Sequence, residues 1–95
     1  MKSGSQRRNS ELAKAIGLRV VSLRTCRGWN QTELAKRAQM ERPILARLEN
    51  GRHVPTLLTL RDVADAFGLG LAELLADVDR RIDDDAACAA LRETA

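Results

Sequence analysis

Two arginines, Arg42 and Arg47, stand out for the chemistry that their type and spacing could perform. A guanidinium group can donate two hydrogen bonds to O6 and N7 of guanine, which discriminates against a wrong base by about 1–3 kcal/mol. This requires an arginine held on a rigid element that fits a DNA groove. Because most surface arginines are merely solvated, the surrounding residues must decide between the two interpretations.

The segment Asn30 to Gly51 is typical of two short helices joined by a tight turn. In the second helix, from about Arg42 to Asn50, a rotation of about 100° per residue places Leu45 and Leu48 on one side. The other side is small or polar and carries Pro43, Ala46, Arg47 and Asn50. The short Ala46 would let the helix approach a groove floor, and Ile44 could contact a thymine methyl group.

No catalytic or metal-binding pattern accompanies these residues. The single histidine, His53, lies in a predicted loop, without a Ser/His/Asp, Cys/His or paired-carboxylate arrangement. The run 83–85 of aspartates lacks the alternation of a calcium loop and suits a solvated helix cap. Cys26 and Cys88 are far apart and lack metal spacing, which favours reduced thiols. We therefore expect no enzymatic activity, no metal and no cofactor.

Composition favours one small all-α domain whose charge is unevenly distributed. The chain has 95 residues and 2% aromatics, so its core must come from Leu, Ile, Val and Ala. Residues 1–53 hold 12 Lys and Arg against 4 Asp and Glu, a charge of +8, whereas residues 54–95 hold 4 against 9, a charge of −5. The first half would attract a polyanion such as DNA, although solvated helix faces give the same composition.

The chain divides by pattern into three regions. Residues 1–9 lack apolar periodicity and predict a flexible basic arm, and residues 10–77 predict five helices. Residues 78–95 form an acidic, Ala-rich tail whose short helix would be marginal alone. No stretch approaches the roughly 20 consecutive apolar residues of a membrane span. The first ten residues lack the apolar central region of a signal peptide. We expect a cytoplasmic protein without a membrane partner.

Capping residues and glycines set the expected helix limits. Ser10 would cap a first helix that ends at Gly28, and Asn30 and Glu33 have the spacing of a capping box for the second. Thr56 would cap the fourth helix. The residues expected to face inward on the first helix are Leu12, Ile16, Val20 and Leu23, and on the fourth Leu57, Leu60, Val63, Ala64 and Phe67.

A fifth helix is expected from Gly70 to about Asp77, with Leu71, Leu74 and Leu75 inward. Trp29, just before the second helix, is expected to pack on Leu34 as a hydrophobic staple.

Motifs in this order and spacing resemble the helix-turn-helix DNA-binding domain of the Cro/C1 phage-repressor type, over roughly residues 16–75. They are Leu23-Arg24, Trp29-Asn30-Gln31-Thr32-Glu33-Leu34-Ala35, Arg47-Leu48-Glu49-Asn50-Gly51, and Pro55-Thr56 with Leu60, Ala64, Leu69 and Leu74. The resemblance implies a compact five-helix, lambda-repressor-like fold.

The resemblance also implies roles for individual residues. Arg24 and Glu49 match a buried salt bridge between the first and third helices. The resemblance and the outward side of the third helix together predict the base-contacting residues, which are Arg42, Pro43, Ile44, Ala46 and Arg47. The expected phosphate-contacting residues are Gln31, Asn50, Arg52 and His53.

Two residues depart from the family pattern. Gln39 stands in the turn where Gly is common, so it must adopt a positive φ, which non-glycine residues disfavour. Pro43 biases Arg42 away from the α region, so Arg42 is expected to cap the third helix.

The function expected from these features is that of a dimeric transcriptional regulator, more often a repressor, on a palindromic DNA operator. An antitoxin or a restriction-modification controller would bind DNA in the same way. A protein-interaction adaptor, using the acidic tail to bind a partner, is the alternative from another class. The dimer is expected to form through residues 71–91, with Leu18 and Val21 nearby.

Overall fold

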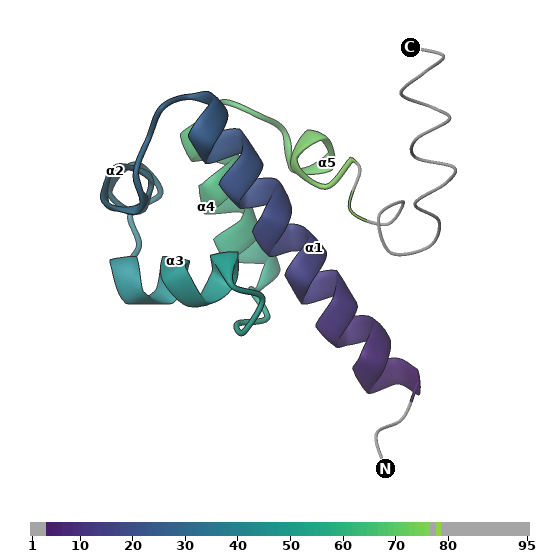
Figure 1. Ribbon diagram of the computed structural model, residues 1–95. Coiled ribbons are helices and arrows are strands. Elements are labelled where there is room, and N and C mark those ends of the chain that lie inside the picture. The colour runs from purple at the N-terminus through teal and green to yellow at the C-terminus, as the bar shows by residue number, and fades with distance from the viewer. Residues whose placement is uncertain (1–3, 77, 79–95) are drawn as a thin grey trace.

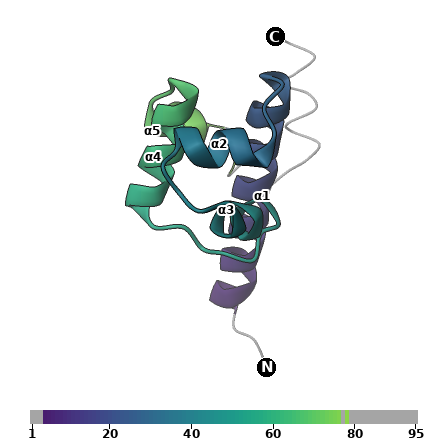
Figure 2. The same cartoon turned by 90° about the vertical axis from the view of Figure 1, so that its left-hand side faces the viewer.

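The protein, described here by a computed structural model over residues 4–76 and residue 78, folds into helices. They are α1 (Gly4–Cys26), α2 (Gln31–Arg37), α3 (Arg42–Glu49), α4 (Leu57–Phe67) and α5 (Leu71–Leu74). The long α1 crosses the molecule, with α2 and α3 on one side and α5 on the other (Figure 1). Turned by 90°, the view shows α3 end-on below α2 (Figure 2). The prediction of a five-helix, all-α fold is confirmed for the described residues.

The first four helices end in the same backbone motif, in which one residue adopts the left-handed conformation. After α2 this residue is Gln39, whose φ is 56°. Its N–H donates to the Lys36 carbonyl at 3.2 Å, and the Met40 N–H donates to the Ala35 carbonyl at 2.9 Å. The corresponding residues after α1, α3 and α4 are Gly28, Gly51 and Gly68. The predicted positive φ of Gln39 is therefore present, and the turn between α2 and α3 is tightly fixed.

Two helix starts follow their predicted caps. The Asn30 side chain accepts the Glu33 N–H at 2.8 Å, and the Thr56 hydroxyl accepts the Thr59 N–H at 3.1 Å. The Glu33 carboxylate, however, pairs with Arg37 at 3.0 Å. Only the Asn30 half of the expected capping box is thus formed.

The start of α1 differs from the prediction. The helix begins at Gly4, so residues 4–9 are helical and Ser10 lies inside the helix. Residues 1–3 of the expected arm lie outside the described residues. Extending a helix is cheap once packing has nucleated it, and no proline interrupts residues 4–9. The absence of apolar periodicity was therefore a poor guide to where the helix begins.

The fifth helix is shorter than predicted, since it ends at Leu74 with Leu75 as its C-cap. The guanidinium of Arg19 binds its last carbonyls, donating to Glu73 O at 2.9 Å and Leu74 O at 3.0 Å. These carbonyls are satisfied from the side by α1 and need no further helical turn. The tail lies outside the described residues, including its predicted short helix, apart from Val78, which is buried.

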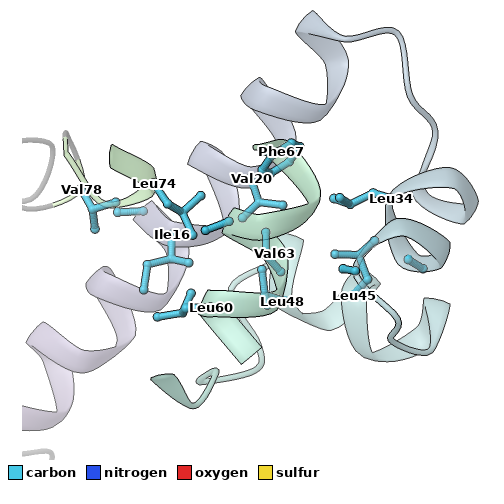
Figure 3. Close-up of a cluster of buried hydrophobic side chains, with 14 residues drawn as sticks. Ile16, Val20, Leu34, Leu45, Leu48, Leu60, Val63, Phe67, Leu74 and Val78 are labelled. Carbon is cyan, nitrogen blue, oxygen red and sulfur yellow. The ribbon is translucent and has the colours of Figure 1, made fainter. Parts of the chain in front are cut away.

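The core lies between α1 and the other helices, and Figure 3 shows its largest side chains. The fully buried ones are Leu34, Leu45, Leu48, Leu74, Val20 and Val63. The prediction that Leu12 and Leu57 face inward is wrong, because these residues are 36% and 65% exposed. Leu57 is the first residue of α4, where a side chain tilts back beyond the start of the helix. None of the helices described is both long and apolar enough to cross a membrane.

Candidate nucleic-acid interface

The third helix has one buried and one exposed side. Leu45 and Leu48 have no exposed surface. On the opposite side Arg42, Pro43 and Arg47 are exposed, and Ile44 and Ala46 are partly buried. The predicted division of α3 between core and solvent is therefore present, and its arginines face solvent.

The start of α3 corrects the expected role of Arg42. Glu41 is the N-cap, Arg42 is the first helical residue and Pro43 follows it. The N–H groups of Ile44 and Leu45 both bond to the Glu41 carbonyl at 3.1 Å. Proline is tolerated in a first turn, where its missing N–H would have no helical acceptor. Its bias on Arg42 is overcome, so Arg42 belongs to the helix.

A buried ion pair joins α1 to α3. Arg24 Nε lies 2.7 Å from Glu49 Oε2, and Arg24 Nη2 lies 3.0 Å from Glu49 Oε1. The two side chains are only 14% and 3% exposed. Arg24 Nη1 also donates to the Trp29 carbonyl at 2.9 Å. This bidentate contact fixes the end of α3 against both α1 and the residue before the N-cap of α2.

Gln31 connects this ion pair to the exposed face of α3. Its Nε2 donates to Glu49 Oε1 at 2.9 Å, while its Oε1 lies 3.4 Å from Arg42 Nη1. A chain of contacts thus runs from Arg24 through Glu49 and Gln31 to Arg42. Gln31, expected to anchor a phosphate, also orients the Arg42 guanidinium.

The other predicted phosphate-contacting residues follow α3 directly. Asn50 is its C-cap, and Asn50 and Arg52 are exposed, whereas His53 is half-buried. They follow the C-terminal end of α3, whereas Arg42 is the first residue of this helix. Three of the predicted phosphate-contacting residues thus lie together after α3, while Gln31 of α2 contacts both Glu49 and Arg42.

Sequence reasoning missed Gly17, which brings α1 onto the end of α3. A Cβ atom at Gly17 would lie 2.5 Å from the carbonyl oxygen of Glu49 and 2.6 Å from that of Leu48. These are backbone atoms, which cannot move aside as a flexible side chain could. The available signal was a single glycine inside a helical pattern, which often marks a close backbone approach.

Several cations of the first half of the chain bind other parts of the protein. Arg19 binds α5, as described above, and Arg27 donates to the Phe67 carbonyl at 3.1 Å. Arg37 lies 4.2 Å from the centroid of the Trp29 ring, besides pairing with Glu33. The charge of +8 therefore overstates the cations available for DNA.

Trp29 packs on Phe67, with ring centroids 5.7 Å apart and planes 9° from parallel. The ring that stacks on Trp29 thus belongs to the last residue of α4. The expected staple between Trp29 and Leu34 stays a prediction. The described residues contain no group of three His, Cys, Asp or Glu side chains arranged to hold a metal ion.

Several known proteins are similar to this chain in sequence. The helix-turn-helix family profile matches residues 22–74. The chain is 33% identical over 69 residues to the uncharacterized HTH-type transcriptional regulator y4dJ of Sinorhizobium fredii, covering 73% of this chain and 90% of that protein. It is 34% identical to the immunity repressor protein of Bacillus phage phi105, covering 65% of this chain and 43% of the repressor. The chain thus spans less than half the length of that repressor.

Two solved structures have a similar fold. The restriction-modification controller protein C.AhdI of Aeromonas hydrophila has a TM-score of 0.63 and 27% identity, covering 65% of this chain and 94% of the controller. The clp gene regulator ClgR of Corynebacterium glutamicum has a TM-score of 0.72 and 28% identity, covering 87% and 88%. The chain belongs to the Cro/C1-type helix-turn-helix family of DNA-binding transcriptional regulators, which are not enzymes.

Proposed function

We propose that the protein binds a specific double-stranded DNA operator, with α3 in the major groove, and regulates transcription as a dimer. The observation that carries this proposal is the division of α3, with Leu45 and Leu48 fully buried and Arg42 and Arg47 exposed. Because its buried side packs on the core, α3 presents its guanidinium donors in a fixed position, as base recognition requires.

The residues of α3 have distinct roles in this proposal. Arg47 donates to a guanine edge, and Arg42 does so from the first turn, oriented by Gln31 at 3.4 Å. Pro43, Ile44 and Ala46 supply the remaining base-contacting surface. Gln31, Asn50, Arg52 and His53 contact the phosphates, which position the helix without selecting a sequence.

Dimerisation follows from the size of the recognition element. A helix of eight residues covers few base pairs, so two copies on a palindrome raise both affinity and specificity. Of the surface expected to form the dimer, Leu74 is fully buried in the core and Leu18 is 58% exposed. Repression rather than activation is supported by the similarity to a phage immunity repressor.

The decisive experiment compares Arg47→Ala with Arg52→Ala. Duplexes bound by the wild-type chain are first selected from random sequence at physiological salt. Arg47→Ala should then weaken the selected duplex by about 1–3 kcal/mol and flatten the base preference. Arg52→Ala should weaken selected and random duplexes alike. Equal losses on both duplexes for Arg47→Ala would contradict base recognition by Arg47.

A restriction-modification controller is a second candidate. It is supported by the similarity to C.AhdI, of which this chain covers 94%. Such a controller would bind DNA through the same helices. A restriction gene beside the coding sequence would favour this candidate, and its absence would favour a general regulator.

A further inference from the structure

Lys14 of α1 lies directly on the end of α3. A Cβ atom at Gly51 would lie 2.7 Å from Lys14 Cγ, 2.9 Å from its Cα and 3.2 Å from its N. The backbone of Gly51, with φ of 73°, therefore touches Lys14 without any intervening side chain. In Figure 1, α1 crosses this end of α3 and continues past it.

Residues on both sides of Gly51 belong to the surface proposed to follow the DNA backbone. Asn50 and Arg52 are both exposed, and so is Lys14. The ammonium group of Lys14 sits on a flexible four-carbon stem. From its position against Gly51 it extends the phosphate-binding surface from the loop after α3 onto α1.

Lys14 also differs from three nearby arginines, of which Arg19 and Arg24 belong to α1 and Arg27 directly follows it. Arg19, Arg24 and Arg27 donate hydrogen bonds to α5, Glu49 and Phe67, respectively. None of the ion pairs within the described residues includes Lys14. Its charge is thus available to a ligand, whereas the charges of the three arginines are used within the protein.

We infer that Lys14 binds a DNA phosphate and makes α1 a third DNA-contacting element, beside α2–α3 and the loop after α3. This inference rests on the proposed DNA-binding function. A phosphate contact adds affinity for every sequence and carries no base preference, because it acts by releasing counterions. Lys14 would consequently raise the salt dependence of binding.

The test is Lys14→Gln, measured by equilibrium binding to the selected duplex and to a random duplex between 50 and 200 mM salt. One lost phosphate contact should reduce the slope of log K against log salt by about 0.9. When salt is raised from 50 to 200 mM, Lys14→Gln should therefore lose roughly 3–4-fold less affinity than the wild type does, on both duplexes. The base preference should be unchanged. Lys14→Arg should restore the wild-type slope.

Lys36→Gln is the matched control, because Lys36 is an exposed lysine in the last turn of α2, away from its N-terminus. It should keep the wild-type slope. A wild-type slope for Lys14→Gln, with Arg47→Ala still losing base preference, would overturn the role of Lys14 alone. If Lys14→Gln instead lowers only the melting temperature, Lys14 acts on the negative end of the α3 dipole and the inference is wrong. A wild-type chain that binds neither duplex overturns both proposals.

Discussion

Glu49 is the only buried charged residue among those described, and it is the last residue of α3, the proposed recognition helix. Its carboxylate accepts two hydrogen bonds from Arg24 and one from Gln31. Burial of a charge is costly unless such partners compensate it. Glu49 therefore holds α3 in place from behind and, through Gln31, influences a side chain on its outer face.

Glu49→Ala should lower the free energy of unfolding by about 3–5 kcal/mol, because Arg24 would remain buried and unpaired. The measurement is urea denaturation followed by circular dichroism at low temperature. The double variant Arg24→Met/Glu49→Leu is the control and should lose less than Glu49→Ala. A double variant less stable than Glu49→Ala would show that packing, rather than the unpaired charge, sets the cost.

Gln39 carries a backbone strain that a substitution can relieve. Gln39→Gly should raise the free energy of unfolding by roughly 0.5–1 kcal/mol, because the left-handed conformation is strained for a non-glycine residue. The reverse control is Gly28→Gln, at a φ of 72° with no atom within 4 Å of the added Cβ. It should lower stability by a similar amount in thermal or urea unfolding. A loss of stability in Gln39→Gly would mean that the Gln39 side chain makes a stabilising contact.

At the scale of elements, the position of α3 depends on how closely α1 approaches it. Gly17 and Gly51 allow two such contacts, each at the end of α3. The Arg24–Glu49 pair lies at the same junction. This end of α3 is thus fixed by backbone contact as well as by an ion pair.

Gly17→Ala should destabilise the domain by about 1–3 kcal/mol, as overpacking typically does. In an unobstructed helix the same change would stabilise by about 0.5–1 kcal/mol, so the sign of the effect is diagnostic. Gly70→Ala is the control for the added methyl group, since its Cβ would meet only the Glu73 carboxylate at 3.4 Å. Gly70 is the N-cap of α5, so this change should cost no more than a lost cap residue and less than Gly17→Ala. Increased stability in Gly17→Ala, measured by thermal unfolding, would rule out the close approach of α1 to α3.

At the scale of the molecule, the proposed dimer determines how two recognition helices meet one operator. Leu18 is 58% exposed on α1, next to Arg19, which binds α5. Leu58 is 78% exposed on α4. Large exposed apolar side chains are candidates for contact with a second copy. Of these two, only Leu18 belongs to the surface expected to form the dimer.

We expect Leu18→Asp to weaken the dimer in sedimentation experiments, because it places a charge in the proposed contact. Leu58→Asp, the control on α4 outside the proposed contact, should leave the dimer unchanged. Truncation after Asp77 should also weaken the dimer if residues 78–91 contribute to it. Unchanged association in both Leu18→Asp and the truncated chain would exclude this dimer surface.

The sequence by itself determined the features that depend on neighbours a few residues apart. Caps at Asn30 and Thr56, left-handed residues at Gly28 and Gln39, and the two sides of α3 follow from local hydrogen bonding and helical periodicity. The resemblance to the family also predicted the Arg24–Glu49 ion pair, which is present. Where no local stop signal exists, as before Ser10, the predicted helix limit was wrong.

Only the tertiary structure decided which distant groups meet. Arg19 and Arg27 donate to carbonyl acceptors 55 and 40 residues away, so their guanidinium groups are engaged within the protein rather than on the proposed DNA-binding surface. Gly17, Gly51 and Lys14 gain their roles only where α1 crosses the end of α3. Residue types and spacing state what each side chain can do, but packing of helices far apart in the chain selects the partner that each one has.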